Sequence, residues 1–171
     1  MKALCIVAHP DDCVIFALSY IHNHPEHDWT IGYLTYTDSD PRGAELSAFW
    51  QRRGIGTVFL GFEDWWEDDV HKQFTRWRSE HAAEACWNLA QDYDLILTHD
   101  ADGDYGHIHH QLVHDAVARH YNMVTFAPHN QGTVTLTVPP GTYTLDELPM
   151  HGDIIQSFHI EQHRNSYKEP Q

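Results

Sequence analysis

The chain has 171 residues, of which 42% are hydrophobic, and this length is enough for one substantial core but short for two full-sized domains. Its formal net charge of −15 means that the average surface repels phosphate backbones and anionic lipid, so we expect neither nucleic acid nor a membrane as a partner. No apolar stretch approaches the length of a membrane span, and three cysteines without a CxxC spacing favour reduced thiols. We therefore expect a single domain over residues 1–171 of a soluble, cytoplasmic protein.

The first predicted elements are a strand, a polar loop and a helix. Residues 2–8 combine apolar and β-branched side chains and end before Pro10, as a buried parallel strand does. Asp12 is expected to cap a helix over about residues 13–21, in which apolar residues recur at the spacing of one helical face.

The same alternation of strands and helices continues along the chain. We expect strands over residues 30–36, 57–60 and 94–98, and helices over residues 44–53, 72–91 and 107–120. Parallel neighbours need crossover helices, and these helices cover both faces of the sheet. The pattern therefore predicts an α/β fold, a three-layer sandwich with a mainly parallel, Rossmann-like sheet.

The C-terminal part shows a different pattern. Residues 133–138 alternate between apolar and polar side chains, Pro139-Pro-Gly141 favours a turn, and residues 142–145 can form a second strand. We interpret these residues as a β-hairpin at the sheet edge.

Two polar clusters follow predicted strands directly. The first is His9-Pro10-Asp11-Asp12, and the second runs from His99 to His110. The carboxyl ends of parallel strands share one edge of a sheet, so both clusters belong at the same edge. A catalytic zinc site needs about three ligands from His and carboxylate groups and an open position, which these two loops can supply.

Each cluster has an ordinary explanation when it is taken alone. A His-Pro-Asp-Asp turn can lie on the surface, and two histidines at helical spacing can be solvated or cap a helix. A nucleotide-binding α/β domain is a further alternative, but neither GxGxxG nor GxxxxGK[ST] follows the first strand.

Four ordered blocks together resemble a known family. Ala8-His-Pro-Asp-Asp12 is followed by Arg42-Gly43 and Phe59-Leu-Gly-Phe-Glu-Asp64, then by Thr98-His-Asp100 and Gly103-Asp-Tyr-Gly-His107 with His110. The order and content of these blocks resemble the PIG-L/LmbE-like N-acetylglucosaminyl deacetylases, from residue 2 to about residue 120.

The resemblance implies a zinc-dependent hydrolase that removes an N-acetyl or other N-acyl group from an amino sugar or sugar conjugate. It assigns one Zn²⁺ per chain, or another divalent transition metal, to His9, Asp12 and His110. The catalytic residues implied are Asp11 as general base, His107 as the group that stabilises the oxyanion and helps protonate the leaving amine, and Tyr105 as a second donor. Arg42 and Asp64 match positions that contact the sugar. The partner implied is thus a small N-acylated molecule, and the sequence is also compatible with a homo-oligomer.

The chain departs from the family pattern at two positions. Cys13 stands where an acid is usual, and Ile108-His109 replaces Pro-Asp, whose acid is expected to orient the catalytic histidine. Asp100, Asp102 and Asp104 are the candidates to substitute for that acid. Two alternatives therefore stay open, which are an amidase acting on a non-sugar or thiol-conjugate amide and a non-catalytic metal-binding member of the same fold.

Overall fold

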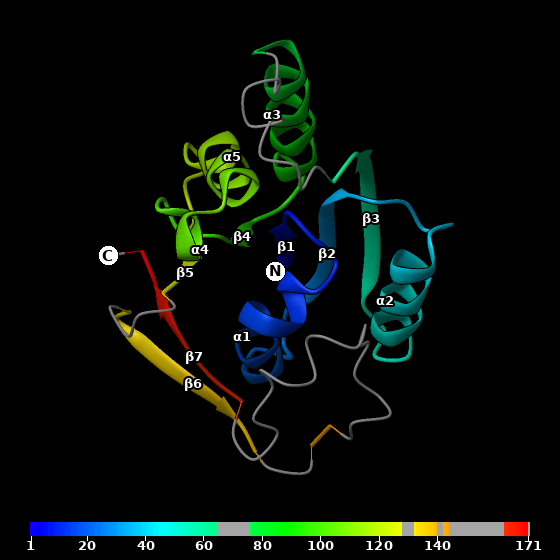
Figure 1. Cartoon of the computed structure of the whole chain (residues 1–171). Helices are drawn as coiled ribbons and strands as arrows, with labels where there is room; N and C mark the ends of the chain where they lie inside the picture. Colours follow the sequence, from blue (N-terminus) through cyan, green and yellow to red (C-terminus); the bar gives the residue numbers. More distant parts are fainter. Residues whose placement is uncertain (65–75, 128–131, 140–141, 144–162, 171) are drawn as a thin grey trace.

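The computed structural model describes residues 1–64, 76–127, 132–139, 142–143 and 163–170 (Figure 1). The N-terminal elements are β1 (Lys2–Val7), the π-helix η1 (Cys13–Ala17), α1 (Leu18–Asn23), β2 (Asp28–Thr35), α2 (Pro41–Gln51) and β3 (Gly56–Phe62). They are followed by α3 (Arg76–Ala90), β4 (Leu95–Thr98), α4 (Gly103–Gly106), α5 (Ile108–Val117), β5 (Met123–Phe126), β6 (Val134–Val138) and β7 (His163–Lys168). None of the described helices combines the length and the apolarity that crossing a membrane requires.

The strands form one mostly parallel sheet, which confirms the predicted fold class. Its order is β3-β2-β1-β4-β5-β7-β6, and every pairing from β3 to β5 is parallel. β1 lies in the centre, between β2 and β4, so its carboxyl end opens onto the middle of the sheet edge. The prediction missed β5, a strand of four residues that lacks a long apolar run.

The C-terminal edge is antiparallel, as expected, but the pairing differs in detail from the predicted hairpin. β6 forms the outermost strand, and its described partner is β7, with Val134 opposite Tyr167 and Val138 opposite His163. Residues 142–143 are described outside any strand, and residues 140–141 and 144–145 lie outside the described part of the chain. We expected residues 142–145 to pair with β6. That position is instead taken by β7, which begins at His163, well after the end of β6 at Val138.

Helices cover both faces of the sheet (Figure 1). Alternate residues of β1 point to opposite faces, because side chains along a strand have a period of two. Ala3, Cys5 and Val7 pack into one core with η1, α1 and α2, whereas Leu4 and Ile6 pack into the other core with α3 and α5. The three layers of the predicted sandwich are therefore present.

The segment after β1 corrects one expectation. The helix predicted over residues 13–21 begins as a π-helical turn, η1, before it continues as α1. Asp12 does not cap it, since its backbone is already helical and its side chain makes no capping hydrogen bond. The Oδ2 atom of Asp12 instead accepts the backbone N–H of His9 at 2.8 Å, which folds the loop back on itself. Single π-helical turns occur frequently at functional sites.

Candidate active site

Two loops at the carboxyl ends of β1 and β4 bring the expected metal ligands together. His9 and Asp12 come from the loop after β1, and His110 comes from the first turn of α5. All three side chains are buried. The loop is anchored by Thr35 of β2, whose backbone N–H and hydroxyl both donate to the carbonyl of Ala8, at 3.1 and 2.8 Å.

The polar atoms of these three residues form a nearly equilateral triangle. Nδ1 of His9 lies 3.3 Å from Oδ2 of Asp12 and 3.2 Å from Nε2 of His110, and the Asp12 and His110 atoms are 3.2 Å apart. Ligands at zinc distances in a tetrahedral site lie about 3.3–3.4 Å from one another. The donor set and its spacing therefore fit a divalent ion with a fourth position left for water or substrate.

A buried carboxylate holds the ring of His110. Oδ2 of Asp104 accepts a hydrogen bond from Nδ1 of His110 at 2.8 Å, so the proton is on Nδ1 and the lone pair of Nε2 faces the triangle. The same oxygen accepts a short hydrogen bond from Nδ1 of His99, whose Nε2 accepts the backbone N–H of Ala8 at 2.9 Å. A ligating histidine backed by a carboxylate is the usual arrangement around a protein metal ion.

Asp104 reaches this position through an uncommon backbone conformation. Its φ of +63° lies in the left-handed region, next to Gly103 with φ of +72°. Asp tolerates this region better than most residues, but it still has an energetic cost. Hydrogen bonds between Asp104 and Asp100 hold the turn, with the N–H of each residue donating to the carboxylate of the other at 3.1 and 3.2 Å. Asp104 thus accepts hydrogen bonds from His99 and His110. In the sequence analysis it was one of three candidates to orient His107.

The carboxylates give the site a strong preference for positive charge. Burial disfavours ionisation of Asp104, but hydrogen bonds from His110 and His99 outweigh it and lower the pKa to about 2. Burial likewise opposes ionisation of Asp12, and its contacts with His110 and His9 bring the pKa well below the usual value. Burial lowers the pKa of His9, yet the hydrogen bonds with Asp12 and Asp64 raise it to about 10. Without a metal, the site therefore retains protons.

His107 caps α5 and remains neutral. Its Nδ1 accepts the backbone N–H of His109 at 3.2 Å, which places the ring proton on Nε2. Burial, followed by the positive potential of His9 and His110, lowers the pKa of His107 to about 3. Its ring centroid lies 4.6 Å from that of His9, so a neutral N–H donor stands beside the triangle of His9, Asp12 and His110. Tyr105, the second expected donor, is 62% exposed, with its ring centroid 5.9 Å from that of His107.

Asp11, Arg42 and Asp64 belong to one polar network. Arg42 forms an ion pair with Asp11 at 3.4 Å and donates to the hydroxyl of Tyr36 at 3.1 Å, and Tyr36 donates to Oδ2 of Asp64 at 3.0 Å. Oδ1 of Asp64 lies 3.4 Å from Nε2 of His9. Burial and the neighbouring Asp12 raise the pKa of Asp11, although Arg42 opposes this shift. Asp64, with a side chain only 6% exposed, is thus no surface ion-pair partner.

Tyr36 is the member of this network that the sequence analysis missed. It follows β2 and has φ of +64°, a conformation uncommon for an aromatic residue. Its hydroxyl stands between Arg42 and Asp64, the two residues at positions that the resemblance assigns to substrate contact. Backbone strain of this kind is typical of a functional site, but no sequence motif predicts it.

Cys13, at the first departure from the family pattern, belongs to the core. Its thiol donates to the carbonyl of Pro10 at 3.3 Å, lies 3.1 Å from the hydroxyl of Tyr33, and accepts the indole N–H of Trp50 at 3.4 Å. Burial raises the pKa of this thiol to about 12, so it is neutral and unreactive at physiological pH. Cys13 therefore ties the loop after β1 to the core.

Comparison with known families decides the classification. Residues 4–121 match the model of the family PIG-L, described as GlcNAc-PI de-N-acetylase, and these residues include both loops of the site. The chain belongs to the PIG-L family. This agrees with the resemblance inferred from the sequence blocks. No curated protein sequence matches the chain.

Several solved structures share the PIG-L fold at low sequence identity. The zinc-inhibited form of teicoplanin deacetylase Orf2 is 12% identical, with a TM-score of 0.53 over 74% of this chain and 67% of its own. The A40926 pseudoaglycone deacetylase Dbv21 is 18% identical, with a TM-score of 0.54 over 72% of this chain and 62% of its own. GalB, the 4-carboxy-2-hydroxymuconate hydratase of Pseudomonas putida KT2440, is 15% identical, with a TM-score of 0.53 over 90% of this chain and 80% of its own. The chain therefore spans less than two thirds of the A40926 deacetylase, and the likeness concerns the fold.

Proposed function

We propose that this PIG-L protein is a zinc-dependent hydrolase that removes an N-acetyl or other N-acyl group from an amino sugar or sugar conjugate. The observation that carries the proposal is the buried triangle of His9, Asp12 and His110, with edges of 3.2–3.3 Å. The family match and the deacetylases among the similar structures support the reaction class.

His9, Asp12 and His110 would hold the ion. A divalent metal in this position would polarise the amide carbonyl and lower the pKa of a water molecule that it binds. The zinc-inhibited form of teicoplanin deacetylase supports zinc as the first ion to test. Nitrogen and carboxylate donors suit other divalent transition metals as well.

Asp11 is the general base in this proposal. It takes a proton from the attacking water while the water oxygen bonds to the acyl carbon, and the same proton then passes to the leaving nitrogen as the C–N bond breaks. The products are the carboxylic acid and the free amine. Arg42, 3.4 Å from Asp11, fixes the direction of the carboxylate and limits the rise of its pKa.

His107 stabilises the oxyanion through its Nε2–H. A neutral imidazole whose Nδ1 is already an acceptor has one proton to share and is a poor acid, so hydrogen-bond donation is its role. This refines the expectation that His107 also protonates the leaving amine, which we now assign to the proton carried by Asp11. Tyr105, exposed beside His107, is the proposed second hydrogen-bond donor.

The network of Arg42, Tyr36 and Asp64 is the proposed substrate contact. It presents a guanidinium, a hydroxyl and a carboxylate within a few ångströms of one another, and the adjoining Asp11 and His9 connect it to the reaction centre. Such mixed donors and acceptors suit the hydroxyl groups of a sugar. A small N-acylated molecule is therefore the proposed partner.

GalB supplies the second candidate reaction. It covers more of this chain than the two deacetylases do, and its name describes a hydratase, which also activates water. The residues favour amide hydrolysis, because the four ordered blocks of the deacetylase pattern are present. The experiment must nevertheless distinguish the two reactions.

The test is a product analysis of zinc-loaded protein. We would incubate it with N-acetylglucosamine conjugates, non-sugar N-acetyl amines and the unsaturated tricarboxylate 4-carboxy-2-hydroxymuconate, and measure released acetate and water addition by mass spectrometry. We expect acetate from an N-acetyl sugar with the wild type and with the exposed control Asp92→Asn, and its loss with Asp11→Asn despite unchanged zinc content. Water addition without acetate release, or full activity of Asp11→Asn, would refute the proposal.

A further inference from the structure

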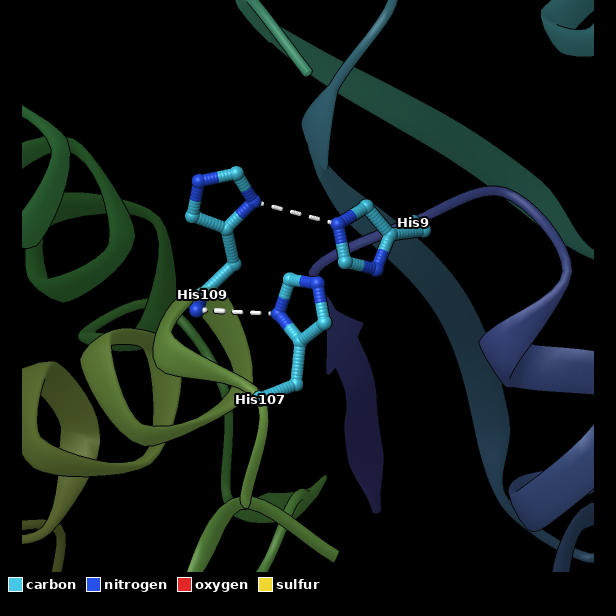
Figure 2. A group of neighbouring side chains, drawn as sticks. All are labelled: His9, His107 and His109. Carbon is cyan, nitrogen blue, oxygen red and sulfur yellow. Dashed lines mark hydrogen bonds between the residues drawn. The ribbon is translucent and has the colours of Figure 1, made fainter. Parts of the chain in front are cut away.

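The ring of His9 lies between two groups of buried polar atoms. Its Nδ1 faces Asp12 and His110 in the metal triangle. Its Nε2 lies 3.1 Å from Nδ1 of His109 and 3.4 Å from Oδ1 of Asp64. Figure 2 shows His109 and His107 projecting from the start of α5 toward His9, with Nδ1 of His109 joined to the His9 ring.

A histidine that ligates through one nitrogen carries a proton on the other. That N–H is buried here, so it needs an acceptor, and a ligating ring without one loses both its tautomer and its orientation. The partner ligand His110 already shows the arrangement, because its Nδ1–H donates to Asp104. The Nε2–H of His9 requires an acceptor in the same way.

We propose that His109 is a positioning residue, whose Nδ1 accepts the Nε2–H of His9 and so turns the Nδ1 of His9 toward the metal. The hydrogen-bond acceptor behind His9 is thus an imidazole, whereas the acceptor behind His110 is a carboxylate. The inference rests on the metal site of the proposed function, and it gives a role to the residue that replaces the expected acid at position 109.

His109 suits this role better than Asp64 alone. Its contact with His9 is the shorter one, 3.1 against 3.4 Å, and the residue is only 2% exposed. It lies in the first turn of α5, where its backbone N–H is held by the side chain of His107. Asp64 is shared, since its other oxygen accepts the hydroxyl of Tyr36 at 3.0 Å.

A second metal ion among His9, His107 and His109 is the competing interpretation, because a ring nitrogen of each lies within 4.8 Å of the other two. The hydrogen bonds argue against it. Nδ1 of His107 accepts a backbone N–H, which leaves the proton on Nε2 and no lone pair directed at an ion. While Nδ1 of His9 binds the first ion, its Nε2 offers a lone pair to a second ion only if the ring becomes an imidazolate.

The experiment measures zinc affinity by competition with a chelator, and the Co²⁺ absorption spectrum as a report of ligand geometry. In His109→Phe, which removes the acceptor, we expect zinc binding to weaken about 10–100-fold and the Co²⁺ spectrum to shift. In His109→Asn, whose Oδ1 takes the place of Nδ1, affinity should return to within about threefold of the wild type. His114→Phe, on the same helix beside Asp115, is the matched control and should bind as the wild type does.

Three outcomes would overturn the inference. They are wild-type affinity and spectrum in His109→Phe, an affinity in His109→Asn as low as in His109→Phe, and a second zinc equivalent in the wild type that His109→Phe loses. If His109→Phe proves unfolded by circular dichroism, His109→Gln replaces it, because its amide extends to the Nε2 position and leaves the Nδ1 position empty. If the wild type does not bind zinc, the metal site itself is rejected. If the wild type binds zinc and His109→Phe binds it equally well, only the role of His109 is rejected.

Discussion

Asp104 holds His110 from the side opposite the metal triangle, with 2.8 Å between the carboxylate Oδ2 and the imidazole Nδ1. This contact fixes which nitrogen of His110 is free to bind an ion. The carboxylate belongs to a residue with a left-handed backbone conformation. It also accepts a hydrogen bond from His99, so one strained residue orients two buried imidazole rings.

We predict that Asp104→Asn weakens zinc binding about 10–100-fold, as loss of a partner behind a metal ligand typically does. Asn tolerates the left-handed backbone, so the variant should remain folded and isolate the loss of negative charge. The measurement is a zinc dissociation constant from chelator competition. Asp102→Asn, an exposed neighbour in the same loop, is the control, and an equal effect of both variants would argue against the role of Asp104.

His107→Asn should lower the turnover number about 10²–10³-fold while zinc content stays at the wild-type level, because the oxyanion loses its donor. Asn can still accept the N–H of His109 and cap α5, so the thermal unfolding temperature should change little. Steady-state kinetics with an N-acetyl substrate measures the effect. A variant that loses its zinc would show instead that His107 is a ligand.

Zinc affinity should rise with pH. The pKa of His9 in the metal-free protein is raised to about 10, so the ring is protonated at neutral pH and a metal must displace that proton. Each displaced proton makes the apparent affinity increase about tenfold per pH unit, here from roughly pH 6 to 8. Calorimetry in buffers of different ionisation enthalpy should detect at least one proton released per zinc. An affinity independent of pH over this range would be inconsistent with the charged triangle.

The three thiols should be inert in the native protein. Cys5, Cys13 and Cys86 are buried, and burial raises the pKa of Cys13 and of Cys86 to about 12. Thiolate is the reactive form, so a thiol reagent should label none of them at pH 8 in the folded state and all three in guanidinium chloride. Native labelling at the rate of a free thiol would mean that the site loop or α3 opens readily.

The main features of the fold and the meeting of the two polar clusters could be predicted from local sequence patterns, whereas the choice of His9, Asp12 and His110 within those clusters is what the resemblance to the family implies. Alternating strands and helices dictate a parallel sheet, and polar residues that directly follow β1 and β4 must meet at one edge of it. His9, Asp12 and His110 therefore converge as expected.

What the sequence did not show depends on backbone conformation and on tertiary contacts. The left-handed turns at Tyr36 and Asp104 aim their side chains into the site, and no residue pattern marks them. Asp12 looked like a helix cap because an acid before an apolar helix usually is one, but the tertiary contact with His110 overrides that local preference. β7 pairs with β6 across a long separation in sequence, which hairpin patterns do not describe.

The most direct test is the metal content of the purified protein and of His110→Ala, measured by plasma mass spectrometry after equilibration with zinc and removal of excess ion. His114→Ala serves as the control on the same helix, and circular dichroism verifies that each variant is folded. If His9, Asp12 and His110 hold the ion, the wild type and the control contain one zinc per chain and His110→Ala contains almost none. Equal zinc in all three proteins, or none in the wild type, would contradict the metal site.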